Sequence, residues 1–204
     1  MKIYGHPMST CVRKVLTTLV EKGHEPDLVM VDLMKGEHKQ PAYLARHPFG
    51  VVPAIDDNGF SLYESRAIIR YIDQTMAGPS LTPTDAKDRA RMEQWIAVEQ
   101  SYFTPAAMKI IMQRMFASFA GKQPDEAIVA QGMAETGKVL DVAAETLKQG
   151  YFAPSGFSLA DICWMPYVEY LFKAGASTLI TERPAVAGWW ERVSSRPSWK
   201  KVVG

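Results

Sequence analysis

A change of pattern along the chain constrains the fold more than any other feature. Up to about residue 75, short β-prone runs alternate with helical stretches, whereas the apolar patterns after residue 84 have helical spacing. Between them, residues 78–84 contain two prolines and a glycine, which are typical of a linker. The sequence therefore predicts an α/β domain over residues 1–77, a linker over residues 78–84 and an all-helical domain over residues 85–204.

The first domain is predicted to follow the order strand, helix, strand, strand, strand, helix. Its strands are expected at residues 2–4, 28–33, 51–55 and 60–63. Asn58-Gly59 between the last two is a strong hairpin signal, because both residue types tolerate positive φ. Helices are expected over residues 10–22 and from Ser65 onward. Four strands with helices on their faces can bury a small α/β core.

The second domain is predicted to contain helices only. They are expected at residues 85–103, 106–120, 124–149, 158–173 and 184–195. Pro105 should end or kink the first of them, because proline removes a backbone donor. Ser158 and Asp161 form a capping-box pattern, with Phe157 and Ile162 placed as a hydrophobic staple. We interpret this motif as a helix start and not as a ligand site.

Composition argues against several classes of protein. Lys+Arg is 23 and Asp+Glu is 22, so a net charge of +1 gives no overall field for nucleic acid or an anionic membrane. No run approaches the roughly 18 apolar residues that span a membrane. The only cysteines, Cys11 and Cys163, lack metal-ligand spacing, so no metal is expected. The first residues lack the apolar core of a signal peptide, and a cytoplasmic location is expected.

A hydroxyl stands where the first strand gives way to the first helix. Ser9 precedes a helix N-terminus, whose free N–H groups and partial positive charge can hold an anion. It lacks a G-x-S-x-G setting, so a hydrogen bond to an anion is a better role than acyl attack. A plain N-cap is the structural alternative. Cys11, one turn into the helix, could be the reactive group instead, or a buried structural cysteine.

Further polar residues could hold the ends of a peptide. Ser65 and the nearby helix amides suit a carboxylate, and Glu64 suits an ammonium group. His38 and Lys39, in a predicted loop, could take a second carboxylate. A cis Val52-Pro53 bond would leave the backbone before the proline free to pair with an extended ligand. A capped helix and solvated charges are the structural alternative.

Taken together, these residues resemble the cytosolic glutathione transferases, and the phi type most. The matching stretches are Gly5–Ser9, Gly36–Lys39, Pro48–Pro53, Glu64–Ile68 and Phe157–Asp161. Each is modest alone, but five in the right order over essentially the whole chain are a strong signal. The resemblance implies a thioredoxin-like N-terminal domain, an all-helical C-terminal domain, a homodimer, and detoxification by conjugating glutathione to hydrophobic electrophiles.

The resemblance also implies a role for each matching residue. Ser9 would be catalytic, donating a hydrogen bond to the glutathione sulfur and favouring its thiolate. The residues implied to bind the rest of glutathione, the co-substrate, are His38, Lys39, Val52, Pro53, Glu64 and Ser65. Further candidates are Thr10, Cys11 and Arg66. No metal is implied.

The sequence departs from the phi pattern at two positions and admits a second alignment. Val51 stands where Gln is common, which removes a contact to the glycyl end of glutathione. His47 stands where Asn is usual, and we expect it to affect the loop and not the chemistry. Ser9-Thr10-Cys11 also resembles the Ser-Ser-Cys stretch of zeta-type isomerases, and a beta-type alignment puts Thr10 at the place of its catalytic cysteine.

Methionine-rich segments are candidates for the electrophile site. The residues proposed to line it are Met8, Met108, Met112, Met115 and Phe116. The last four share one helix face, and methionine surfaces adapt to varied shapes, although helical packing is the alternative. Phe49 is either an aromatic key into a partner subunit or a core residue. Glutathione-dependent isomerisation, peroxide reduction and a non-catalytic binding or assembly module remain alternative functions.

Overall fold

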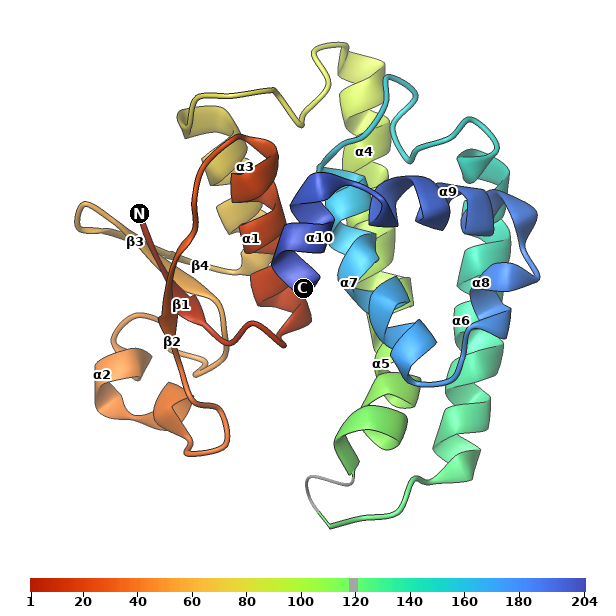
Figure 1. Cartoon of the computed structure of the whole chain (residues 1–204), viewed down its shortest axis with the longest axis horizontal. Helices are drawn as coiled ribbons and strands as arrows, with labels where there is room; N and C mark the ends of the chain where they lie inside the picture. Colours follow the sequence, from red (N-terminus) through yellow and green to blue (C-terminus); the bar gives the residue numbers. More distant parts are fainter. Residues whose placement is uncertain (118–120) are drawn as a thin grey trace. The chain divides into compact units, whose positions relative to one another are not determined.

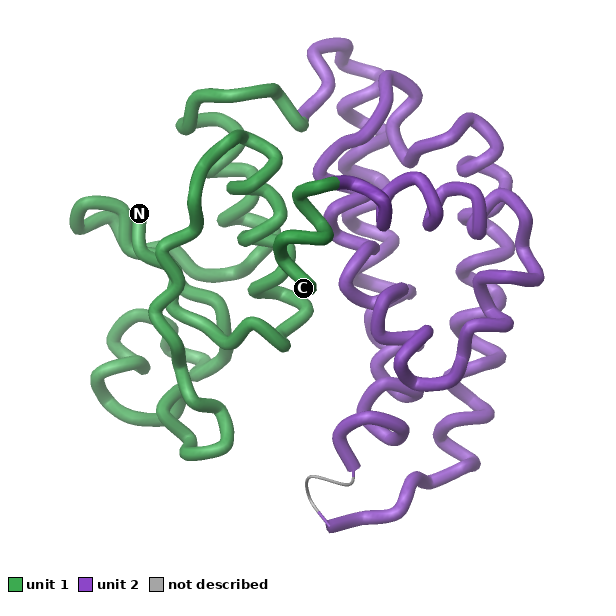
Figure 2. Tube along the Cα trace, viewed as in Figure 1, with its two compact units in different colours: residues 1–81, 197–204 green, residues 82–196 purple. Residues whose placement is uncertain are grey.

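The computed structural model describes residues 1–117 and 121–204 of the 204-residue chain. These residues form two compact units (Figure 2). Unit 1 comprises residues 1–81 together with residues 197–204, and unit 2 comprises residues 82–196. Within the described residues, no helix is long and apolar enough to span a bilayer.

Unit 1 is built on a four-stranded sheet (Figure 1). Its strands are β1 (Lys2–Gly5), β2 (Asp27–Met30), β3 (Ala54–Asp57) and β4 (Phe60–Tyr63), in the spatial order β2-β1-β3-β4. Strand β1 is parallel to β2 and antiparallel to β3, which is antiparallel to β4. The hairpin signal is confirmed, because Asn58 and Gly59 adopt φ of 54° and 92° at the turn. Strand β3 begins only after Pro53, which has no backbone N–H to donate to a ladder.

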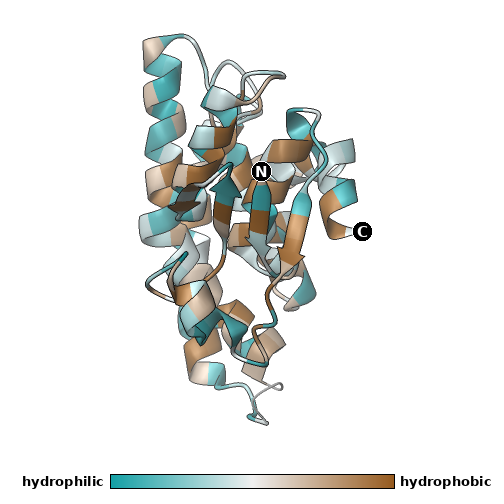
Figure 3. Cartoon of the chain, turned by 90° about the vertical axis from the view of Figure 1, so that its left-hand side faces the viewer, coloured by the Kyte–Doolittle hydropathy of each residue, from teal (hydrophilic) through white to brown (hydrophobic). Residues whose placement is uncertain are grey.

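Helices cover the two faces of this sheet. Helices α1 (Thr10–Glu21) and α3 (Ser65–Thr75) pack together on one face, and α2 (Pro41–Leu44) lies on the other (Figure 1). The side chains buried completely on the α1/α3 side include Ile3, Val12, Val15, Ile55, Ile68 and Ile72. Tyr43 of α2 packs on the opposite face with Tyr4 and Ala54. Figure 3 shows the resulting mixture of apolar (brown) and polar (teal) segments along the strands.

The first part of the predicted linker is fixed to unit 1 by a buried ion pair. Lys22 Nζ lies 3.2 Å from Asp73 Oδ1, and both side chains are 2% exposed. The same ammonium donates to the Pro79 carbonyl at 3.1 Å, and the Leu81 amide donates to Asp73 at 2.9 Å. Gly78 adopts φ of 117°, and a Cβ there would lie 2.2 Å from the Lys22 carbonyl oxygen. Glycine is therefore required where the chain leaves α3.

The last residues of the chain belong to unit 1. Helix α10 (Pro197–Val203), which the sequence did not predict, packs against α1. Ser198 donates a hydrogen bond to Glu21, Lys201 pairs with Glu25, and Trp199 is 1% exposed. Sequence analysis had placed these residues in the helical domain, but contacts with α1 group them with the sheet.

Unit 2 is all-helical in its described residues. Its helices are α4 (Ala86–Val98), α5 (Thr104–Ile111), α6 (Glu126–Leu147), α7 (Leu159–Lys173), α8 (Thr178–Thr181) and α9 (Pro184–Ser194). Two π-helical segments, η2 (Glu99–Phe103) and η3 (Met112–Phe116), precede and follow α5. Pro105 lies in the first turn of α5, where its missing N–H is tolerated. The helix that was expected to end or kink at Pro105 instead passes through the π-helical segment η2 into α5. The end of the predicted helix over residues 106–120 lies outside the described residues.

The capping box at the start of α7 is confirmed, and it lies in the core of unit 2. Asp161 accepts hydrogen bonds from the Ser158 amide at 2.8 Å and from the Ser158 hydroxyl at 3.1 Å. It also accepts from the Phe152 amide at 3.3 Å and from Trp189 Nε1 at 2.8 Å. The motif therefore starts α7 and also joins it to α9 and to the segment that precedes α7.

Candidate active site

The sheet register brings four candidate segments to one end of unit 1. Gly5, which ends β1, is paired with Met30, which ends β2. Ala54, which begins β3, is paired with Tyr4 and with Tyr63, which ends β4. The segments that leave the sheet at this end are residues 6–9, 31–39, 51–53 and 64–65. They contain the polar residues that sequence analysis assigned to glutathione.

Ser9 is the N-cap of α1. Its side chain accepts a hydrogen bond from the Val12 amide at 3.4 Å, and its own amide donates to the His6 carbonyl at 2.8 Å. A hydroxyl that accepts from the helix still has its proton to donate, so the N-cap and anion-binding roles are compatible. Thr10 and Cys11 are the first two residues of α1, and all three residues are half-buried.

In the described structure, the backbone amide and carbonyl of Val52 are unpaired, and they lie at the end of the sheet from which the chain runs to Ser9. The Val52–Pro53 peptide bond is cis, and across residues 1–117 and 121–204 no protein group hydrogen-bonds the Val52 amide or carbonyl. Tyr43, a residue that sequence reasoning missed, donates from its hydroxyl to the Val51 carbonyl at 2.7 Å. Burial raises the pKa of Tyr43 to about 12, so it remains a donor. The free amide and carbonyl of Val52 can therefore pair with the backbone of an extended ligand.

Glu64 and Ser65 occupy the start of α3. Glu64 precedes the helix with φ of 72°, a conformation that is unfavourable for a residue with a Cβ and that clusters at functional sites. Its carboxylate is exposed, whereas Ser65 is 3% exposed. An exposed anion beside a hydroxyl at a helix N-terminus can hold an ammonium and a carboxylate of the same ligand. Arg66, the next residue, is half-buried.

His38 and Lys39 lie in a short 3-10 helix, η1 (Glu37–Lys39). The preceding turn is held by Asp32, whose carboxylate accepts from the amides of Met34 and Lys35 at 2.9 and 3.0 Å. Lys39 Nζ donates to the Phe49 carbonyl at 3.3 Å, which ties η1 to the loop before Val51. These interactions place two basic side chains at the edge of the site.

His47 is a second residue that sequence reasoning did not assign to the site. It is 1% exposed, and its ring lies 4.6 Å from the Tyr63 ring and 6.2 Å from the Phe49 ring. Burial lowers the pKa of His47, the Glu64 carboxylate opposes that change and Lys39 adds to it. The ring is therefore within electrostatic reach of both predicted ends of the ligand site.

The predicted electrophile residues lie in two parts of the chain. Met8 is 43% exposed in unit 1, and Met112 is 47% exposed in unit 2. Met108, Met115 and Phe116 are half-buried, so the whole set lies outside the fully buried core. In the described part of the chain, no group of three or more His, Cys, Asp or Glu side chains could hold a metal ion.

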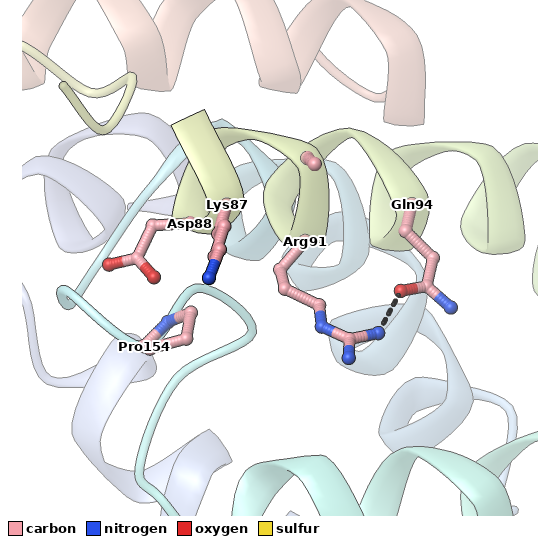
Figure 4. Close-up of a pocket in the computed structure, with 6 residues that line it drawn as sticks. Lys87, Asp88, Arg91, Gln94 and Pro154 are labelled. Atoms are coloured by element: carbon pink, nitrogen blue, oxygen red, sulfur yellow. Dashed lines mark hydrogen bonds between the residues drawn. The ribbon is translucent and has the colours of Figure 1, made fainter. Parts of the chain in front are cut away.

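A shallow cavity of about 400 Å³ on unit 2 contains none of these residues (Figure 4). It is lined by Lys87, Asp88, Ala90, Arg91, Gln94 and Pro154. Arg91 donates to Gln94 at 2.8 Å, and most of the lining is exposed. The cavity offers no buried polar group to a ligand, so we assign it no role in the site.

Comparisons with known proteins show which family the chain belongs to. Residues 1–74 match the family described as glutathione S-transferase, N-terminal domain, and residues 103–197 match its C-terminal domain. Glutathione S-transferase F9 of Arabidopsis thaliana is 41% identical, and the match covers 100% of this chain and 96% of that protein. The chain belongs to the glutathione S-transferase family.

Solved structures of the glutathione S-transferase family share the whole fold. Glutathione transferase F7 from Populus trichocarpa has a TM-score of 0.94 and 43% identity, covering 98% of this chain and 96% of that one. Glutathione S-transferase I from maize, solved with an atrazine glutathione conjugate, has a TM-score of 0.91 and 31% identity, covering 98% and 95%. The relatives with an F designation are of the phi type, which confirms the predicted subtype.

Proposed function

We propose that this protein is a glutathione transferase that activates glutathione at Ser9 and transfers it to hydrophobic electrophiles. The observation that carries the proposal is the convergence of Ser9, the unpaired backbone of Val52 and the Glu64-Ser65 helix start at one end of the sheet. Glutathione is an extended tripeptide with an ammonium at one end and carboxylates at both. Its shape and charges match these three features in order.

The chemical task is to keep a thiol ionised at neutral pH. A free thiol has a pKa of about 8.5, and only the thiolate is a strong nucleophile. The Ser9 hydroxyl and the N-terminus of α1 favour the charged form, and the thiol proton passes to solvent. The thiolate sulfur then bonds to an electrophilic carbon, and in a substitution the leaving group departs with the electron pair of the broken bond.

The rest of the tripeptide is assigned to the neighbouring segments. The Val52 amide and carbonyl pair with the cysteinyl backbone, next to Pro53. Glu64 binds the γ-glutamyl ammonium, and Ser65 binds the γ-glutamyl carboxylate. His38 and Lys39 attract the glycyl carboxylate. Additional contacts to glutathione are proposed for three residues that lie near Ser9 or Ser65 in the sequence, namely Thr10, Cys11 and Arg66.

The electrophile is assigned to apolar side chains outside the buried core. Those proposed are Met8, Met108, Met112, Met115 and Phe116. Flexible thioethers tolerate ligands of different shape, so a broad range of apolar acceptors is expected. A cytoplasmic location, where glutathione stays reduced, fits this chemistry.

The protein is also proposed to be a homodimer. Phe49 is 70% exposed, which does not fit the alternative of a core residue. Its ring is supported by His47 and Tyr63 at 6.2 and 6.3 Å. A supported, exposed aromatic ring suits insertion into a second copy of the chain.

Replacing Ser9 with alanine tests the proposed function. Ser9→Ala should lower conjugation of glutathione to an activated aryl halide by about 100-fold, the effect of removing one donor from a developing anion. Binding of S-methylglutathione should change little, and Ser195→Ala, at an exposed serine, should behave as wild type. An unchanged rate in Ser9→Ala would exclude Ser9, and Thr10→Ala and Cys11→Ala would then be compared.

Side-by-side assays separate the remaining functions. The phi-type relatives favour transfer over isomerisation, so an activated aryl halide should react faster than maleylacetoacetate or an organic hydroperoxide. A non-catalytic module would bind glutathione resin but would show no thiolate absorbance when glutathione is added. Thiolate absorbance with wild type and its loss in Ser9→Ala would exclude that module.

A further inference from the structure

His47 is built into the base of the loop that carries Val51 and Val52. Its amide donates to the Tyr43 carbonyl at 3.0 Å, and its own carbonyl accepts from the Gly50 amide at 2.8 Å. The imidazole ring packs on the Tyr63 ring with an interplanar angle of 32°, and Tyr63 directly precedes Glu64 in the sequence. The residue therefore connects the Val52 loop with the start of α3, the two segments proposed to hold the cysteinyl and γ-glutamyl parts of glutathione.

The ring is buried without full polar satisfaction. His47 Nδ1 is inaccessible to solvent and has no hydrogen-bond partner among the residues that the structure describes. A neutral ring can leave this atom unprotonated. An imidazolium must carry a proton on both nitrogens, which would place a donor without an acceptor among aromatic side chains. Protonation is therefore expected to disturb the packing of His47 against Tyr63 and Phe49.

The charged surroundings do not reverse this expectation. Glu64, which follows β4, and the backbone of His47 itself favour the imidazolium, whereas Lys39 of η1 disfavours it. Tyr63 is the titratable side chain that packs on the ring face. Desolvation is the largest effect and lowers the pKa of His47 below its ordinary value of 6.5. At neutral pH, the His47 ring is therefore neutral when the loop has its native conformation.

We propose that His47 is a positioning residue whose neutral form holds the loop of residues 48–52 in its glutathione-binding geometry, so that protonation of His47 weakens glutathione binding. The inference rests on the proposed function of this site. Glutathione would bring its ammonium to Glu64 and its glycyl carboxylate to Lys39, with opposite electrostatic effects on the ring. The coupling therefore acts through the packing of the loop.

Calorimetric titration with S-methylglutathione between pH 5.5 and 7.5 tests this proposal. The thioether has no thiol to ionise, and its other groups do not titrate in this range. For wild type, the Kd should be flat near pH 7.5 and should rise toward acid, approaching about tenfold per pH unit where His47 is protonated. His47→Asn and His47→Gln should give a flat profile. His38→Asn and the distant His24→Asn should retain the acid rise.

Proton exchange on binding supplies a second readout that needs no variant. At pH 5.5, binding should release protons from wild type, seen as a heat that changes with the ionisation enthalpy of the buffer. Carboxylate binding at His38 would instead take protons up, so the sign distinguishes the two histidines. Release at pH 5.5 that disappears at pH 7.5 is the expected result.

Three outcomes would overturn the inference. A flat Kd with no proton release in wild type would exclude His47 while the proposed function stands. An acid rise that persists unchanged in His47→Asn would assign the effect to another group and exclude His47. Absence of binding at pH 7.5 would refute the glutathione site and this inference with it.

Discussion

Replacing Asp161 with alanine should destabilise unit 2 more than any change at its surface. The side chain is fully buried, and it accepts hydrogen bonds from two backbone amides, a hydroxyl and the Trp189 indole. Alanine would leave at least three buried N–H donors without a partner, at roughly 1–3 kcal/mol each. Removing the carboxylate also removes a buried charge, so part of this loss is offset.

The size of that offset follows from the ionisation of Asp161. Burial raises its pKa from 3.8 to about 6, although all four hydrogen bonds oppose that change. A shift of this size corresponds to about 3 kcal/mol of disfavoured charge at neutral pH. The expected net loss in Asp161→Ala is therefore about 3 kcal/mol, which lowers Tm by roughly 6–12 °C for a chain of this length.

Urea and thermal unfolding at pH 7.5 provide the assay. Asp141→Ala is the matched control, because its side chain is 64% exposed and its ion pair with Arg183 should contribute less than about 1 kcal/mol. If Asp161→Ala unfolds at the same midpoint as Asp141→Ala, the hydrogen-bond reasoning is refuted.

The pH dependence gives an independent check on Asp161. Between pH 3.8 and about 6 the folded chain binds this proton more tightly than the unfolded chain, because the folded pKa is raised. The contribution of Asp161 to the free energy of unfolding therefore falls as pH rises through this window and is constant above it. The stability of wild type relative to Asp161→Asn should decline from pH 4 to 6 and then level off.

Three further variants test other parts of unit 1. Lys22→Met should lower the free energy of unfolding by about 3 kcal/mol or more in urea titration, because it leaves its buried aspartate partner uncompensated. Tyr43→Phe removes the hydrogen bond to the Val51 carbonyl, so KM for glutathione should rise about threefold to tenfold with kcat nearly unchanged. Phe49→Ala should shift light scattering from dimer to monomer on dilution, and a stable dimer would exclude the proposed key.

The sequence could predict those site features that depend on neighbouring residues. Ser9 as an N-cap and the Asn58-Gly59 turn follow from backbone preferences over a few residues, and both are present in the structure. Sequence patterns also predicted the strands whose ends carry the candidate site. The pairing of β1 with β3 was not predictable, because it joins residues about 50 positions apart.

Sequence patterns missed features that depend on distant contacts. Tyr43 and His47 lie in a short helix and loop with no strong periodicity, and their roles come from contacts with Val51 and Tyr63. Helix α10 follows the helical domain in sequence but packs on α1, and its Trp199 is buried. Propensity and spacing carry no information about such contacts.

By itself, then, the sequence determined where helices and turns begin, which residues could carry charge or a hydroxyl, and which family the chain resembles. Tertiary structure alone decided that Ser9, Val52 and Glu64 leave the sheet at one end, and that His47 is buried within electrostatic reach of Glu64 and Lys39. Local signals arise from a residue and its near neighbours. Burial and convergence depend on strand register and packing, which join segments that are far apart along the chain.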